Sequence, residues 1–404
     1  MKRLLKVSLF VGAFFFFGHV AQPIIPAQPS TIDAQTTIPE DAEAVCNDGV
    51  QESGALYRIC MPNFISSWNG GLVVYAHGYV AEGEPLAIPA EATDLANLVT
   101  FLGYGFATTS YRVNGLAVLP AMEDLTDLVA IFETEQGVPD RVFITGPSEG
   151  GLIAALSAEK SPDIYDGALA ACGPYGDFQA QINYIGDFRV VFDYFFPGLM
   201  PGSPVNIPQT LMDDWDNHYA TVISPVISQT LALTPTLISQ LMTVTGAPYT
   251  PGEPASQTEN TIEGLLWYNV FGTNNAAEVL GGQPFDNTSR TYTGSDDDTA
   301  LNAGVARFSA DPTARDEIAA NYQTTGHFII PVVTMHTTQD EIVPYFHVPL
   351  YEDKILYPSI HTHFAVERYG HCNFNDSETL TAFAVLIELV DNPAFPVYLP
   401  IIWK

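Results

Sequence analysis

A short stretch at residues 142–160 restricts the fold of this chain more than any other feature. It reads VFITGPSEGGLIAALSAEK, in which an apolar run of strand type, a glycine-rich corner and an apolar helix follow one another directly. Glycine has no Cβ, so glycines on both sides of Ser148 allow a turn that is too tight for other residues. The side chain of Ser148 is then expected at the tip of a sharp strand-to-helix turn. Its simplest alternative role is that of a helix N-cap.

Strand-type and helix-type segments alternate on both sides of this corner. The helical segments carry apolar residues at helical spacing, as Leu125, Leu128 and Phe132 do, whereas the strands are short apolar runs. This alternation predicts a parallel α/β sheet with helices packed on its faces. Strands are predicted at 71–78, 106–111, 142–145, 167–172, 329–337 and 362–371, and helices at 91–105, 122–137, 150–160 and 377–390.

The alternation stops between residues 176 and 325, where the sequence is rich in Pro, Thr and aromatic residues and contains irregular helical patches. The simplest account is one α/β core made of residues 55–175 and 326–404, with residues 176–325 inserted as a cap above it. Residues 28–54 read as a polar leader followed by the start of a hairpin.

The corner also matches the pattern G-x-S-x-G, here Gly146 to Gly150. Between a strand and a helix, this pattern is typical of a serine nucleophile held in strained backbone geometry above the carboxyl ends of the strands. A serine hydroxyl needs a base and a group that orients the base. In the chain order expected for this fold, Asp340 follows the penultimate predicted strand and His371 lies in a glycine-tethered loop after the last one.

Other residues compete for these roles. His77, His336, His361 and His363 lie at or near strand ends, where a structural role is the simpler interpretation. For the acid, the alternatives to Asp340 are Glu341, Asp353 and Asp177.

An acyl-transfer site also needs two preorganised N–H donors for the oxyanion. The amide of Glu149, directly after the nucleophile, is the first candidate. The second is the amide of Tyr79, in the His-Gly-Tyr turn after the strand at 71–78, where Gly78 allows a close approach.

These four motifs together resemble the α/β-hydrolase superfamily, and in particular its secreted serine hydrolases. AHGY, GPSEGG, HTTQDEIVP and YGHCNF correspond in order to the oxyanion loop, nucleophile elbow, acid loop and histidine loop. The resemblance implies a mostly parallel eight-stranded sheet with a large, mainly helical cap after the sixth strand. In the tannase and feruloyl esterase group, a disulfide ties the nucleophile and histidine loops together. Here Pro147, not a cysteine, precedes the serine, but a Cys172–Cys372 bridge would still hold the histidine loop.

The N-terminal segment, the cysteines and the net charge indicate the compartment in which the protein functions. MKRLLK followed by an apolar run predicts a secretory signal peptide within residues 1–27, and the run is short for a membrane anchor. Four cysteines fit an oxidising compartment, and Cys46 and Cys60 flank a segment that resembles a pinned hairpin. We therefore expect a secreted or periplasmic protein. A formal net charge of −32 makes nucleic acid and anionic membranes poor partners.

The expected activity is hydrolysis of carboxylic esters with hydrophobic or aromatic groups, or of a polyester, because the cap segment is rich in apolar residues. A serine exopeptidase is the alternative, with DDWD at 213–216 as a possible site for a substrate ammonium. A non-catalytic binding protein on the same fold is the third class. No cofactor is expected, and no Cys/His cluster has zinc spacing. SDDDT at 295–299 reads as a solvated turn rather than a calcium site.

Overall fold

Eight strands form one mixed, mostly parallel sheet in the computed structural model, which describes residues 43–63, 67–249 and 255–392. The strand order is β1-β2-β4-β3-β5-β6-β7-β8. From β4 to β8 all neighbouring strands are parallel, whereas β1 and β2 are antiparallel to their neighbours. The strands are β1 Val45–Val50, β2 Leu56–Met61, β3 Gly71–Tyr75, β4 Gly105–Thr109, β5 Arg141–Pro147, β6 Gly167–Ala171, β7 Val332–Gln339 and β8 His361–Tyr369.

Helices cover both faces of the sheet, which is why its central strands are apolar on both sides. In β3, Leu72 and Val74 face one layer of the core, which contains α2 and α3. The next residues along the strand, Val73 and Tyr75, face the other layer, which contains α1 and α13. The two-residue period of a strand thus supplies both layers. These helices are α1 Ala92–Phe101, α2 Val118–Gln136, α3 Glu149–Lys160 and α13 Asp376–Asp391. Two short helices lie between β7 and β8: α12 His347–Glu352 and η4 Pro358–Ile360.

The N-terminal hairpin is part of the same sheet. Cys46 and Cys60 lie directly opposite each other in the antiparallel pair β1–β2 and form a disulfide. The predicted hairpin pinned by these cysteines is therefore confirmed. Because β1 begins at Val45, the sheet starts ten residues before the predicted core boundary at 55.

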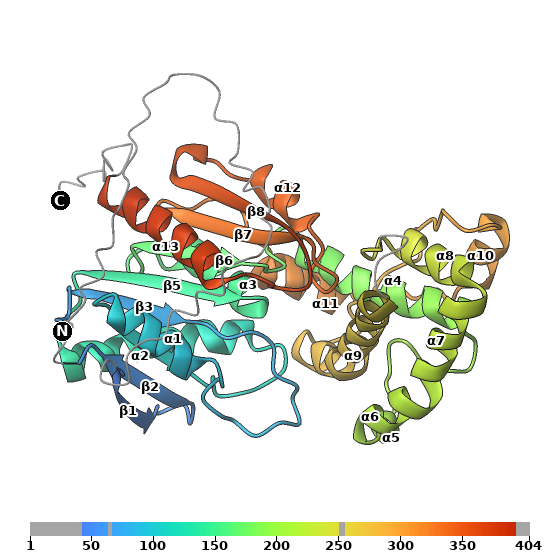
Figure 1. Ribbon diagram of the computed structural model, residues 1–404, viewed down its shortest axis with the longest axis horizontal. Coiled ribbons are helices and arrows are strands. Elements are labelled where there is room, and N and C mark those ends of the chain that lie inside the picture. The colour runs from blue at the N-terminus through green and yellow to red at the C-terminus, as the bar shows by residue number, and fades with distance from the viewer. Residues whose placement is uncertain (1–42, 64–66, 250–254, 393–404) are drawn as a thin grey trace, which may run out of the picture.

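Between β6 and β7 the described chain is mainly helical, and we call residues 178–322 the helical insert. Figure 1 shows its helices α4 to α10 gathered beyond one end of the sheet. They enclose a second core, which includes Phe188, Phe192, Trp215 and Leu266. The elements are α4 Phe178–Phe195, α5 Gln209–Asp213, α6 Trp215–His218, η2 Tyr219–Ile223, α7 Ser224–Leu233, α8 Pro235–Thr245, α9 Ala255–Val279, α10 Asp298–Gly304, α11 Pro312–Glu317 and η3 Ile318–Tyr322.

The last part of the helical insert packs differently from the rest. Ala314 of α11 and Ile318 and Tyr322 of η3 are buried in the core beneath the sheet, not in the second core. The ring of Tyr322 stacks on Phe178 at the start of α4, with ring centroids 5.2 Å apart. Both ends of the helical insert are thus fixed to the main core.

No single helix in the described ranges has the length and apolar composition needed to cross a membrane. One bent pair, Trp215–Leu233 with Pro235–Thr245, passes that test by length and composition only. The predicted signal peptide at 1–27 lies outside the described residues.

Candidate active site

Ser148 lies at the corner between β5 and α3, and its backbone is strained. Its φ of 57° and ψ of −123° are unusual for a residue with a side chain. Its N–H donates to the carbonyl of Ala171 at the end of β6, with an N···O distance of 3.0 Å. The side chain makes no capping hydrogen bond to α3, so its hydroxyl is not used as an N-cap. The predicted strained turn is confirmed.

The glycines of the corner are required by close backbone contacts. A Cβ added at Gly146 or at Gly150 would overlap the carbonyl oxygen of Ala76, which follows β3. A Cβ at Gly151 would overlap the carbonyl oxygen of Ala171. The motif therefore lets α3 start directly against the ends of β3 and β6, and this packing presents Ser148 at the carboxyl edge of the sheet.

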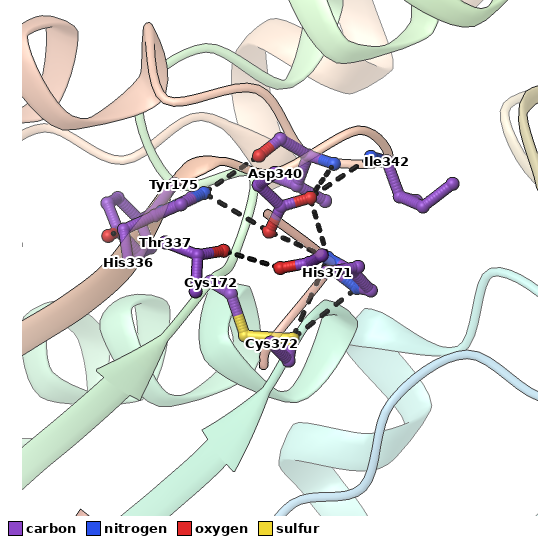
Figure 2. Close-up of a disulfide and its surroundings, with 10 residues drawn as sticks. Cys172, Tyr175, His336, Thr337, Asp340, Ile342, His371 and Cys372 are labelled. Carbon is purple, nitrogen blue, oxygen red and sulfur yellow. Dashed lines mark hydrogen bonds and ion pairs between the residues drawn. A yellow bond between two sulfur atoms is a disulfide. The ribbon is translucent and has the colours of Figure 1, made fainter. Parts of the chain in front are cut away.

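Asp340 and His371, which come from the loops after β7 and β8, are in direct contact. His371 Nδ1 lies 2.9 Å from Asp340 Oδ1 and 2.8 Å from Oδ2. The carboxylate also accepts the N–H groups of Ile342 and Val343 at 3.0 and 2.8 Å. Figure 2 shows the Asp340 carboxylate between the His371 ring and the Ile342 amide. Because Nδ1 donates to Asp340, the lone pair of the neutral ring is on Nε2, the atom that a general base needs free.

The helical insert holds the acid loop in place. The Tyr184 hydroxyl of α4 donates to the carbonyl of Glu341 at 2.8 Å, and Gln181 Nε2 donates to the carbonyl of Ile342 at the same distance. Ile342 and Val343 are themselves buried in the second core. The position of Asp340 therefore depends on packing between the sheet and the insert.

The pKa values of the pair shift in opposite directions, as expected for an ion pair. Burial alone would lower the pKa of His371, but the charge and hydrogen bond of Asp340 outweigh it, so the pKa lies above its ordinary value. Burial alone would raise the pKa of Asp340, but the charge of His371 and the hydrogen bonds it receives hold the pKa below its ordinary value. Asp340 is thus ionised at neutral pH and favours the protonated form of His371.

A disulfide connects this pair to the serine corner. Cys172, directly after β6, is bonded to Cys372, directly after His371, with their Cα atoms 5.4 Å apart. Both cysteines have positive φ values, 44° and 50°. The bond implied by the resemblance is therefore present. It fixes the histidine loop to the strand end whose Ala171 carbonyl binds the Ser148 amide.

The serine and the histidine are not hydrogen-bonded to each other in the described part of the chain. His371 Nε2 lies 3.4 Å from the Cys372 sulfur instead, as Figure 2 shows. The Ser148 side chain interacts with the hydroxyl of Tyr268 on α9. Catalytic hydrogen bonds are often long or misaligned before substrate binds, so the missing contact does not by itself exclude His371 as the base of Ser148.

Two amides are available for an oxyanion. Neither the N–H of Tyr79 nor that of Glu149 donates a hydrogen bond within the described ranges. The Tyr79 hydroxyl donates to the carbonyl of Phe271 on α9 at 3.0 Å, which ties the oxyanion loop to the helical insert. The prediction that glycine at position 78 is needed for a close approach is wrong. A Cβ at Gly78 would meet Ser148 Cβ at 3.4 Å, which is an ordinary contact.

The side chain of Glu149 is buried beside the nucleophile and is only 7% exposed. Its Oε1 accepts the N–H of Ala117 at the start of α2 at 2.9 Å. Burial raises its pKa to about 8, and the hydrogen bond from Ala117 opposes this only partly. The N-termini of α2 and α3 also favour the ionised form, by about 0.3–1 kcal/mol each, which is less than the several kcal/mol that desolvating a carboxylate costs.

A largely apolar cavity opens above Ser148, between the sheet and the helical insert. Four of its polar residues are close to the serine or to the acid loop: Tyr79, Glu149, Gln181 and Tyr268. Its remaining wall is mainly aliphatic and aromatic. Most of it comes from α4, α9 and the acid loop, and Leu116 before α2 and Phe285 after α9 complete it: Leu116, Phe178, Ile182, Ile185, Ala276, Phe285, Ile342 and Val343.

The competing histidines have structural partners. His336 Nε2 donates to the Val343 carbonyl at 2.7 Å, and it lies 3.5 Å from Asp340 Oδ2. His361 and His363 share the Thr334 hydroxyl, at 3.0 and 2.9 Å. His77 stacks on Tyr111, with centroids 3.9 Å apart, and its Nδ1 donates to the carbonyl of Gly78.

The competing acids are not paired with His371 as Asp340 is. Asp177 caps α4 by accepting the Ala180 N–H at 3.0 Å, and Asp353 is exposed at the end of α12. Glu341 is closer to the site, since its charge contributes to the raised pKa of His371, but its Oε2 has no hydrogen-bond partner.

Metal-binding arrangements are limited. In the ranges that the structure describes, the one group with metal-ligand spacing is Cys172, His371 and Cys372, and its sulfurs are bonded to each other. In the SDDDT segment, Asp297 caps α10 by accepting the Ala300 N–H, and Asp298 accepts from Ser295. These two carboxylates accept hydrogen bonds within the turn that precedes α10 and at its N-terminus.

The sequence predicts neither the place of Tyr268 at the site nor the contact of His336 with Asp340. Tyr268 lies within the aromatic-rich stretch 176–325, and helical periodicity cannot tell which aromatic residue of a buried helix faces a cavity. His336 was assigned a structural role, and its contact with Asp340 arises from a loop that turns back on its own strand. The four-residue spacing of His336 and Asp340 is the available signal for that contact.

No family model matches the sequence, and no curated protein matches it either. Solved structures do match. An esterase from Aspergillus oryzae has a TM-score of 0.45 and 13% identity, over 86% of this chain and 79% of that one. The Pyrococcus furiosus esterase PF2001 has a TM-score of 0.43 and 12% identity, over 91% and 97%. The Pyrococcus horikoshii acylaminoacyl peptidase has a TM-score of 0.43 and 10% identity, over 91% of this chain and 46% of the peptidase.

The strand order, the parallel crossovers and the strand-to-helix corner after β5 together define the fold. This chain has the α/β-hydrolase fold.

Proposed function

We propose that this protein is a serine hydrolase that cleaves uncharged carboxylic esters through an acyl-enzyme. The observation that carries the proposal is the His371–Asp340 pair, which a disulfide attaches to the strand end beside the strained Ser148 corner.

In the proposed reaction, His371 Nε2 takes the proton of Ser148 as Oγ attacks the ester carbonyl. The carbonyl oxygen becomes an oxyanion and accepts hydrogen bonds from the amides of Tyr79 and Glu149. The imidazolium, stabilised by Asp340, then protonates the alcohol that leaves. Water repeats these steps on the acyl-enzyme and releases the acid.

The cavity supports an uncharged substrate with an apolar group. Its walls are mainly aliphatic and aromatic, and two of its amide side chains are already occupied: Gln181 binds Ile342, and Asn269 binds Arg189 and Pro204. The aspartates of DDWD do not support the exopeptidase alternative, because Asp213, Asp214 and Asp216 are exposed and none lines this cavity.

We further propose that the protein works outside the cytoplasm, as a secreted or periplasmic enzyme. The two disulfides are compatible with an oxidising compartment, and one of them is at the site itself. The net charge of −32 is consistent with a soluble substrate or a neutral polymer, rather than nucleic acid or an anionic membrane.

A substrate panel tests the proposed function. p-Nitrophenyl esters from acetate to decanoate are compared with aminoacyl-p-nitroanilides at equal enzyme concentration. We expect kcat/KM for the esters to rise with acyl length while the cavity fills, since each buried methylene is worth about 0.8 kcal/mol, and then to fall. The anilides are expected to be poorer by at least about 100-fold. Faster cleavage of the anilides would favour the peptidase, and no cleavage of either class would favour a binding protein.

A further inference from the structure

The side chain of Glu149 takes no part in the reaction described above, although it is the carboxyl closest in sequence to the nucleophile. It lines the cavity together with Ser148. Oε1 is occupied by the Ala117 N–H, whereas Oε2 has no hydrogen-bond partner among the described residues. Oε2 is also not one of the fully enclosed unpaired atoms, so part of its surface is accessible.

The surroundings of Glu149 carry no positive charge in the part of the chain that the structure describes. Burial and the Ala117 amide are the causes of its pKa shift, and no Lys or Arg contributes. The titratable groups coupled to it are tyrosines from four different elements: Tyr79 after β3, Tyr111 after β4, Tyr268 on α9 and Tyr322 of η3. Each of them is uncharged at neutral pH, because burial raises its pKa.

We propose that Glu149 determines specificity as an uncharged carboxyl: Oε1 accepts the Ala117 N–H, the Oε2 hydroxyl donates to an oxygen of an uncharged ester, and ionisation of this group suppresses hydrolysis. This inference rests on the proposed function, because it assigns the charge state that the same site needs.

Ionisation opposes the reaction for an electrostatic reason. The backbone N–H of Glu149 is a proposed oxyanion donor, so a carboxylate on the same residue places a second negative charge beside the developing one. In a cavity with little water, the repulsion between like charges a few ångströms apart is weakly screened. Burial raises the pKa of Glu149 to about 8, so the uncharged form predominates at neutral pH and is lost in mildly alkaline solution.

The pH dependence of kcat/KM for p-nitrophenyl butyrate tests the proposal in wild type and in Glu149→Gln. Glutamine keeps an acceptor for the Ala117 N–H and a donor for the cavity, but it cannot ionise. Wild type is expected to lose about tenfold or more between pH 7 and pH 9.5. The kcat/KM of Glu149→Gln, divided by its own value at pH 7, is expected to stay flat to pH 9.5, because glutamine does not ionise. His371, whose pKa is raised, produces the acid limb of both profiles equally.

A stability measurement reports the same charge state without using activity. A carboxyl whose pKa is higher in the folded than in the unfolded protein contributes stability that is lost as pH rises toward the folded value. The urea midpoint of Glu149→Gln, relative to wild type, is therefore expected to rise from pH 5 to about pH 8 and then stay constant. A difference that does not change over this range would mean that Glu149 is ionised throughout, and this would overturn the proposal.

Two further outcomes separate this inference from the proposed function. If Glu149 instead anchors a substrate ammonium, cleavage of an aminoacyl ester will increase as pH rises through 8 and will be lost in Glu149→Gln; this result contradicts the inference but leaves a serine hydrolase in place. If no ester is cleaved at any pH while the urea midpoints still diverge as expected, the proposed function fails and the uncharged carboxyl stands.

Discussion

Replacing Ser148 with alanine is expected to lower kcat/KM for p-nitrophenyl esters by about 10⁴-fold or more, while the folded protein keeps its stability. The loss is large because the acyl-enzyme route needs a nucleophilic oxygen, and the remaining groups only stabilise slow attack by water. The Ser148 side chain makes no capping hydrogen bond to α3, so its removal leaves the helix intact. Steady-state kinetics and the urea midpoint, measured on the same preparations, separate the two effects.

Ser161→Ala is the matched control, because Ser161 lies at the other end of α3. Its kcat/KM is expected to match wild type within about twofold. If Ser148→Ala retained a tenth or more of wild-type activity, another residue would have to be the nucleophile, and the assignment of the corner would be wrong.

Removing the Cys172–Cys372 disulfide is expected to reduce both activity and stability strongly. The double variant Cys172→Ser/Cys372→Ser loses the link between the β6 end and the histidine loop. Because a displacement of about 1 Å at a catalytic group costs on the order of 100-fold, kcat should fall by at least that factor. The bond closes a loop of 200 residues, so in the chain-entropy model its loss lowers the free energy of unfolding by roughly 5 kcal/mol.

Cys46→Ser/Cys60→Ser supplies the control, since that disulfide spans 14 residues in the β1–β2 hairpin, at the edge of the sheet opposite to β8. It is expected to lose about 3 kcal/mol of stability and to keep its kcat in the folded fraction. Equal losses of kcat in the two double variants would show that the site disulfide acts only on global stability. Kinetics below the unfolding transition, with the folded fraction measured by circular dichroism, distinguish these cases.

The sheet was predictable because its strands and helices differ in local pattern. The predicted strand at 142–145 is β5, Arg141–Pro147, and the predicted helix at 377–390 is α13, Asp376–Asp391. β1 was predicted only as one arm of a hairpin and not as part of the main sheet, because it is an edge strand whose residues are largely exposed and it has no apolar run. Edge strands are stabilised by one neighbour and by the disulfide rather than by burial.

The site was predictable to the extent that its parts lie at strand ends. Chain order alone brought Asp340 and His371 to the same edge, and the contact between them confirms this. What chain order does not contain is the rotation of side chains within the site. The Ser148 hydroxyl is directed to Tyr268, and the Glu149 carboxyl to Ala117. Both contacts depend on how α9 and α2 pack against the corner, which is tertiary information.

The packing of the helical insert was also predictable only in part. The sequence shows that the insert is rich in aromatic residues, and Phe188, Phe192 and Trp215 form its own core. The packing of α11 and η3 into the main core was not expected, because their short segments have no clear apolar periodicity. The contacts that close the cavity come from α4 and α9, and their cavity-facing residues are fixed only once both helices are docked.

The crystal structure of the protein after reaction with a fluorophosphonate tests the central claim most directly, because the adduct imitates the tetrahedral intermediate. We expect phosphorus bonded to Ser148 Oγ, one phosphonyl oxygen within hydrogen-bond distance of the Tyr79 and Glu149 amides, and His371 Nε2 turned from the Cys372 sulfur toward Oγ. An adduct on a different residue, or a ring that stays on the sulfur with Oγ out of reach, would contradict the account.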